Sequence, residues 1–167
     1  MERATKRYTP EAAKTKMYAY CAYQERSHQE VRSKLDSLGV YGDPAEQIIS
    51  DLITAGYLNE ERFAKAFAGG KFRIKGWGRV RIQRELEMHG VTKNCIRAGM
   101  NEIDDDDYRK TLEKLLHKKA ATLSNDTPIV RRDKLGRFAI SKGYESDLVW
   151  KTLDEMPIGK TQAQGDA

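Results

Sequence analysis

The sequence has little of the chemistry that metal, redox or membrane proteins need. Cysteine occurs only at Cys21 and Cys95, and this spacing matches neither a metal site nor a redox pair. We interpret both as small residues on helix faces and expect a reducing, cytoplasmic location. No apolar run approaches the roughly 18 residues of a transmembrane helix, and no signal-type segment opens the chain, so we expect no membrane association.

Large apolar side chains are also scarce. Of 167 residues, 39% are hydrophobic and 33% are charged, with only four phenylalanines and two tryptophans. This composition disfavours one large core and favours several thin cores between helices. No segment shows the alternating pattern of a strand, so the sequence predicts an all-α fold.

Catalytic and metal-binding constellations are missing as well. His28, His89 and His117 are scattered, and none has a second potential ligand at the spacing of a recognised metal motif. We expect His28 and His89 to be solvated. The run Asp104 to Asp107 is interpreted as a complement to a helix dipole. There is no nucleotide-binding glycine loop after a strand and no nucleophile elbow. We therefore expect no enzyme activity, no catalytic residue, no metal and no cofactor.

What the sequence does contain is a helix ending that occurs three times. Each copy has two apolar residues four positions apart on one helix face, followed by a glycine suited to a left-handed C-terminal cap. The glycines Gly39 and Gly90 are 51 residues apart, and Gly90 and Gly143 are 53 apart. The copies are Val31, Leu35 and Gly39-Val40, then Ile82, Leu86 and Gly90-Val91, then Leu135, Ala139 and Gly143-Tyr144. Such a period indicates tandem repeats.

Helix-start signals divide each repeat into three helices. Thr9, Ser27, Thr127 and Ser146 are expected N-caps, and Gly69-Gly70 is expected to end or weaken a helix. We predict an elongated array of three three-helix repeats, each resembling a helix-turn-helix. The predicted boundaries are a flexible N-terminus at 1–9, repeats at 10–57, 58–103 and 104–156, and a disordered tail at 157–167.

Positive charge is concentrated in two places within a net charge of +5. The segment from Lys71 to Arg84 holds six cations in fourteen residues, with apolar residues and glycines between them, and we expect a loop leading into a helix. A basic loop of this kind suits phosphates or an acidic protein groove, although an ordinary solvated face is also compatible. The candidate contact residues are Lys71, Arg73, Lys75, Trp77, Arg79, Arg81 and Arg84, and in the third repeat Arg131, Arg132, Lys134 and Arg137.

Several of these stretches resemble a known family. Gly56 to Ala64 reads Gly-Tyr-Leu-Asn-Glu-Glu-Arg-Phe-Ala, which is similar to the Gly-Tyr-Leu-Asp-Asp-Glu-Arg-Phe-Ala signature of RecX regulatory proteins. The first and third repeats resemble the opening and closing repeats of that family. The motif that follows the Gly56–Ala64 signature in that family is similar to Lys75-Gly76, Arg79, Ile82, Glu85-Leu86 and Gly90-Val91 of this sequence.

The resemblance implies a modulator of the RecA recombinase, built from three-helix repeats and not an enzyme. It implies binding within the groove of the RecA–DNA filament and inhibition of strand exchange, ATP hydrolysis and co-protease activity. We expect a monomer that contacts RecA, DNA or both. The residues leave two other hypotheses open: a stand-alone DNA-binding protein acting through its basic face, and a scaffold with no nucleic-acid role.

Overall fold

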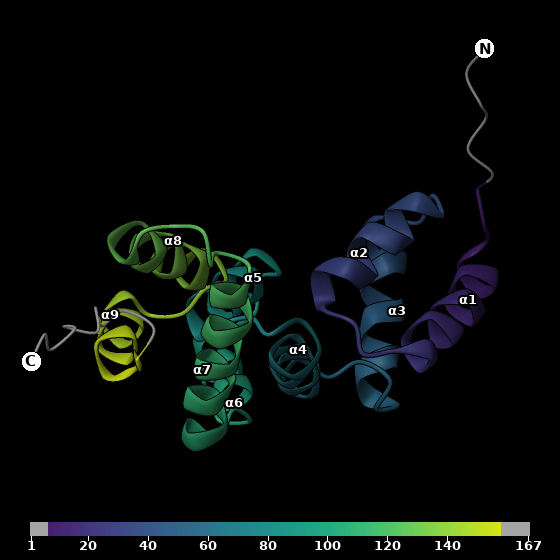
Figure 1. Ribbon diagram of the computed structural model, residues 1–167. Helices are drawn as coiled ribbons and strands as arrows, with labels where there is room; N and C mark the ends of the chain where they lie inside the picture. The colour runs from purple at the N-terminus through teal and green to yellow at the C-terminus, as the bar shows by residue number, and fades with distance from the viewer. Residues whose placement is uncertain (1–6, 158–167) are drawn as a thin grey trace, which may run out of the picture. The chain divides into compact units, whose positions relative to one another are not determined.

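The computed structural model describes residues 7–157, which form nine α-helices with no strand among them (Figure 1). The predicted all-α class is confirmed. Most of the predicted flexible N-terminus and of the predicted disordered tail lies outside the described residues. The helices are α1 (Pro10–Tyr23), α2 (His28–Ser37), α3 (Gly42–Thr54), α4 (Glu60–Lys75), α5 (Arg79–Met88), α6 (Lys93–Met100), α7 (Asp105–Ala121), α8 (Pro128–Ser141) and α9 (Ser146–Glu155).

Three of the helices begin at the caps that the sequence predicts. The hydroxyls of Thr9 and Thr127 each accept a hydrogen bond from a backbone N–H three residues ahead, and Ser27 forms a complete capping box. The prediction for α9 was wrong by one residue, because Ser146 is the first helical residue and Glu145 precedes it as the cap. A carboxylate near a helix N-terminus is favourable there.

The three repeated glycines follow helices as predicted. Gly39, Gly90 and Gly143 have φ angles of 75°, 72° and 100°. Residues that carry a side chain rarely adopt this left-handed backbone conformation, which explains why glycine recurs at these positions. In each case the next residue turns its N–H back to the helix: Val40 to Leu35, Val91 to Leu86 and Tyr144 to Ala139.

Gly69-Gly70 does not end the helix, which was one of the two effects expected of it. Helix α4 continues through both glycines to Lys75, so residues 71–75 are helical and only residues 76–78 connect α4 with α5. A glycine inside a helix costs about 1 kcal/mol relative to alanine, but packing of an apolar face outweighs such propensities. Ala68 and Phe72 supply that face, being 0% and 7% exposed.

His89 also differs from expectation, since it is half-buried rather than solvated. Its ring centroid lies 5.4 Å from that of Phe63 and 5.5 Å from that of Phe67, both in edge-on geometry. Its Nδ1 lies 3.3 Å from the Ser27 hydroxyl. The residue therefore packs in a small aromatic cluster.

The chain divides into two compact units, one comprising residues 1–67 and 85–101 and the other residues 68–84 and 102–167. In the first, α1, α2 and α3 pack together around Met17, Leu35 and Leu52, all fully buried. In the second, α8 packs against both α7 and α9. Its largest fully buried side chains are Tyr108, Tyr144, Ile82, Leu112, Leu116, Leu135 and Leu153. The division into three repeats stays a prediction.

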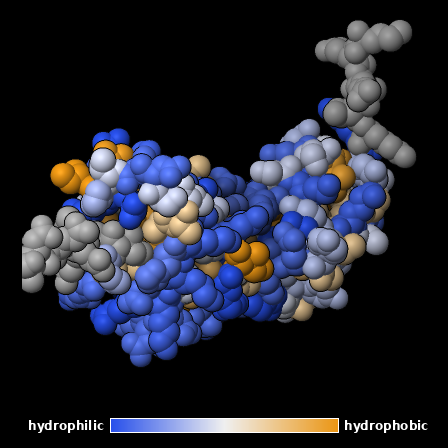
Figure 2. All heavy atoms as spheres, viewed as in Figure 1, coloured by the Kyte–Doolittle hydropathy of each residue, from blue (hydrophilic) through white to orange (hydrophobic). Residues whose placement is uncertain are grey.

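The face of the molecule seen in Figure 2 is mainly hydrophilic. In the space-filling view, apolar residues occur as small separate patches surrounded by polar ones (Figure 2). In the part of the chain that the structure describes, no helix is long and apolar enough to cross a membrane.

Candidate partner-binding surface

Two cations contact the ring of Trp77 in the central basic segment. The Lys71 ammonium nitrogen is 4.8 Å from the centroid of the Trp77 ring, and the Arg81 guanidinium carbon is 4.0 Å from it. Such contacts stabilise by roughly 0.5–2 kcal/mol, depending on exposure. The structure therefore brings three of the predicted site residues together.

The glycines around Trp77 approach their own chain rather than a partner. The N–H of Gly78 donates to the Lys142 carbonyl at 2.8 Å, and the Tyr144 hydroxyl donates to the Gly76 carbonyl at 3.1 Å. A Cβ on Gly78 would lie 2.2 Å from the carbonyl carbon of Gly143, a distance that no side chain tolerates. The turn after α8 therefore fills the space beside Gly78.

Arg79 is held from several sides within the second unit. Its Nη2 donates to the Asp105 carboxylate at 2.6 Å and to the Ile103 carbonyl at 3.2 Å. Its guanidinium carbon lies 4.2 Å from the centroid of the Tyr108 ring. The Tyr108 hydroxyl accepts from the Arg79 backbone N–H at 2.9 Å and donates to Glu145 at 2.8 Å. Arg79 is thus part of the unit's internal framework.

Burial perturbs the two tyrosines beside this framework. It raises the pKa of Tyr108 well above its usual range, and the hydrogen bond to the Glu145 carboxylate adds to the effect. Burial likewise raises the pKa of Tyr144, with Glu145 again contributing. Both phenols therefore stay neutral and can donate their hydrogen bonds up to strongly alkaline pH.

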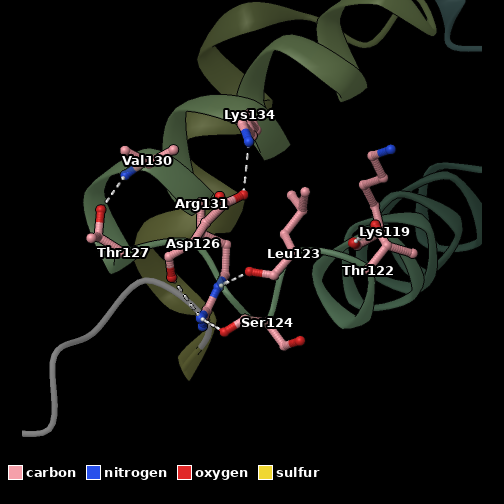
Figure 3. A network of polar contacts seen from close by, with 9 residues as sticks. All are labelled: Lys119, Thr122, Leu123, Ser124, Asp126, Thr127, Val130, Arg131 and Lys134. Carbon is pink, nitrogen blue, oxygen red and sulfur yellow. Dashed lines mark hydrogen bonds and ion pairs between the residues drawn. The ribbon is translucent and has the colours of Figure 1, made fainter.

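Two of the four candidate cations on α8 contact the segment that precedes this helix (Figure 3). The Arg131 guanidinium donates to the carbonyls of Leu123, Ser124 and Asp126 at 3.1, 3.2 and 3.1 Å. The Lys134 ammonium lies 2.9 Å from the Asp126 carboxylate. These two candidate residues organise the connection between α7 and α8.

The remaining α8 candidates also have acidic partners. Arg132 pairs with Asp154, and its guanidinium carbon lies 4.9 Å from the centroid of the Trp150 ring. Arg137 pairs with Asp133 one helical turn away at 3.1 Å, with its side chain 79% exposed. All four cations proposed on α8 are therefore engaged inside the unit.

A groove between the C-terminal half of α4 and helix α7 contains cations that the sequence analysis did not select. Its volume is about 620 Å³. Arg73 and Lys75 were candidates, whereas the three lysines on α7 were missed. Their spacing of four residues along one helix could have indicated that they share a face of that helix. The missed residues are Lys110, Lys114 and Lys118.

The Gly56–Ala64 signature has a structural explanation. The Asn59 side chain accepts a hydrogen bond from the Arg62 N–H at 2.8 Å, as an N-cap does, and the Arg62 guanidinium donates back to the Gly56 carbonyl at 2.9 Å. Arg62 also pairs with Glu25. Phe63 is 4% exposed and belongs to the core. The motif thus specifies how α4 begins.

No group of three or more histidine, cysteine or acidic side chains in residues 7–157 is arranged to hold a metal ion. The partner-binding candidates described above are basic surfaces.

Comparison with known proteins agrees with the all-α fold. The model of the second three-helix domain of RecX matches residues 59–100, and that of the third matches residues 105–153. A Regulatory protein RecX from Prosthecochloris aestuarii is 30% identical over 137 residues, covering 82% of this chain and 88% of that protein. The chain belongs to the RecX family. The resemblance of its motifs to this family is therefore confirmed.

RecX proteins differ in length, and the solved structures support the fold. A Regulatory protein RecX from Lactobacillus johnsonii is 24% identical, and the match covers 86% of this chain but only 53% of that protein. The crystal structure of RecX from Lactobacillus salivarius superposes with a TM-score of 0.78 at 23% identity, covering 87% of this chain and 95% of that one. At that identity the structural match shows the helical-repeat fold alone.

Proposed function

We propose that this protein binds the RecA–DNA filament and restrains the ATPase, strand-exchange and co-protease activities of RecA. The observation that carries the proposal is membership of the RecX family, whose second and third three-helix domains are both matched here. A regulatory role fits a surface on which positive charge is concentrated, as around Trp77 and in the groove between α4 and α7.

Within this function, we assign the primary contact surface to the face around Trp77. Arg81 stacks on this ring, and Arg84, one turn further along α5, is exposed. Arg79 and the α8 cations are already committed to internal partners, so they contribute to the function mainly by holding the unit together. A cation without an internal acid can neutralise an external carboxylate or phosphate more favourably.

The proposal is tested by titrating the protein into a RecA ATPase assay on single-stranded DNA and into a strand-exchange assay. We expect inhibition in both, and we expect the double variant Arg81→Glu/Arg84→Glu to weaken it. The matched control is Arg109→Glu/Lys151→Glu, which makes the same change in net charge at two exposed positions elsewhere in the second unit.

Two results would contradict the proposal. Unchanged RecA activity at saturating protein would remove the function itself. Equal inhibition by the wild type and by a folded Arg81→Glu/Arg84→Glu variant would show that the face around Trp77 is not the primary contact surface. Tight and steeply salt-dependent binding to naked DNA without RecA would instead favour the stand-alone DNA-binding hypothesis.

A further inference from the structure

The groove between α4 and α7 is a concavity of the second unit lined by charges of mainly one sign. Arg73 and Lys75 extend from α4 on one side, and three lysines extend from α7 on the other. Asp107 is the only acid among the lining residues. The α7 cations are Lys110, Lys114 and Lys118.

The groove cations lack the internal partners that the α8 cations have. All five are exposed, and no ion pair within residues 7–157 joins any of them to an acid. The three lysines recur every fourth residue, so they lie about 6 Å apart along the helix axis. Like charges held this close repel one another, and a negatively charged partner would relieve that repulsion.

Apolar side chains lie next to the cations. Ile74 is 81% exposed although it lines the groove, and Phe72, 7% exposed, lies at its base. Leu115 lines the opposite side and is half-buried. An exposed isoleucine beside a row of lysines matches a partner with both apolar and acidic groups.

A nucleic-acid strand fits this groove poorly. Binding of single strands relies on exposed aromatic rings for base stacking, and the only aromatic residue in the lining, Phe72, is buried. The row of lysines spans only about 12 Å. Beyond it lie the four carboxylates of residues 104–107, which would repel a phosphate backbone continuing along α7. A short acidic protein segment meets neither obstacle.

We propose that this groove binds an acidic amphipathic helix of a partner protein. Its carboxylates, spaced every fourth residue, would face Lys110, Lys114 and Lys118, and an apolar side chain between them would pack on Ile74 and Leu115. This inference goes beyond the proposed action on RecA, because it specifies the chemistry of the bound segment and holds whichever protein carries it.

The test uses the full chain and a fluorescent peptide probe in an anisotropy titration. The probe is a helical peptide of about fifteen residues with glutamates at every fourth position and leucines beside them. We expect Lys110→Glu/Lys114→Glu to weaken binding by about tenfold or more, and binding to decline as salt rises. Arg109→Glu/Lys151→Glu is the matched control and should bind as the wild type does.

A second variant separates a protein ligand from a nucleic acid. Ile74→Ser removes an exposed apolar side chain without touching charge, so the fold should be retained, and we expect affinity for the peptide to decrease by about fivefold. Circular dichroism and thermal unfolding verify the fold of every variant. The proposal is overturned if the peptide does not bind, if the lysine variant or Ile74→Ser binds it as well as the wild type, or if an oligothymidylate displaces it.

Discussion

The second unit carries two groups of basic side chains that look alike in the sequence and differ in the structure. On α8, Arg131, Arg132, Lys134 and Arg137 all contact carbonyls or carboxylates of their own unit. The groove between α4 and α7 is lined by five cations and a single acid, Asp107. The first group holds the unit together, and the second is available to a partner.

The difference shows that the density of positive charge alone does not identify a binding surface. A cation inside a hydrogen-bonded framework stabilises the fold, and it cannot bind an external anion without giving up those contacts. A cation repelled by its neighbours gains when an anion arrives. The comparison therefore makes opposite predictions for stability and for binding.

The largest expected effect on stability is that of Arg131→Ala. The substitution removes three hydrogen bonds from a charged donor to the carbonyls of Leu123, Ser124 and Asp126. We expect the free energy of unfolding to decrease by about 3 kcal/mol, because charged hydrogen bonds contribute about 1.5–3 kcal/mol each but are not additive. Urea unfolding followed by circular dichroism measures this value.

The control for Arg131 is Arg131→Lys, which keeps the charge but has a single donor nitrogen in place of the separate Nε and Nη2 that contact the three carbonyls. We expect the lysine variant to lose most of the same stability. If both variants unfold at the wild-type urea concentration, the guanidinium does not hold the α7–α8 connection, and α8 no longer differs from the groove in this respect.

The next largest effect tests the same distinction within one helix, where Arg79 has internal partners and Arg84 is exposed. Arg79→Ala should lower the free energy of unfolding by about 2 kcal/mol through loss of the contacts to Asp105, Ile103 and Tyr108. Arg84→Ala should change it by no more than about 0.5 kcal/mol. Equal losses in both variants would contradict the distinction.

The buried tyrosines beside Arg79 can be tested at alkaline pH, without substituting a cation. Burial raises the pKa of Tyr108 and of Tyr144 above the unfolded value of about 10. Above that value the unfolded chain loses these protons while the folded chain retains them. Stability is therefore fully present below about pH 10 and should decline by about 1.4 kcal/mol per pH unit for each tyrosine as pH rises further.

The variant Tyr108→Phe removes one of the two titrating groups. Its stability at neutral pH should be lower than that of the wild type, because Glu145 and the Arg79 N–H lose a partner. Its decline above pH 10 should nonetheless be about half as steep. Urea unfolding at several alkaline pH values measures both, and an unchanged slope would show that Tyr108 does not contribute.

Local rules predicted much of the fold. The hydroxyl caps at Thr9, Ser27 and Thr127 and the left-handed glycines at Gly39 and Gly143 depend on neighbouring residues, and all were predicted correctly. Gly69-Gly70 was expected to end or weaken a helix, and it does not end α4 because burial of Ala68 and Phe72 is a tertiary effect. Propensity within a short window contains no information about such packing.

The candidate site was less predictable because it depends on partners distant in sequence. Arg79 meets Asp105 and Tyr108, more than twenty residues away, and Gly78 meets the turn at Gly143. No spacing in the sequence indicates these contacts. The three groove lysines on α7 could have been found in the sequence because they recur every fourth residue. Only the fold shows that Arg73 and Lys75 line the same groove.

The smallest expected effect tests where the distinction between the two groups ends. Arg137 belongs to the α8 cluster, but its pair with Asp133 is exposed, with the two side chains 79% and 54% accessible. Exposed pairs one turn apart contribute about 0.3–0.5 kcal/mol, so Arg137→Ala should be nearly neutral in urea unfolding. Lys114→Ala in the groove should be neutral or slightly stabilising, since it removes repulsion between lysines. A loss above about 1 kcal/mol for Lys114→Ala would mean that the groove cations also hold the unit together, and the contrast with α8 would no longer stand.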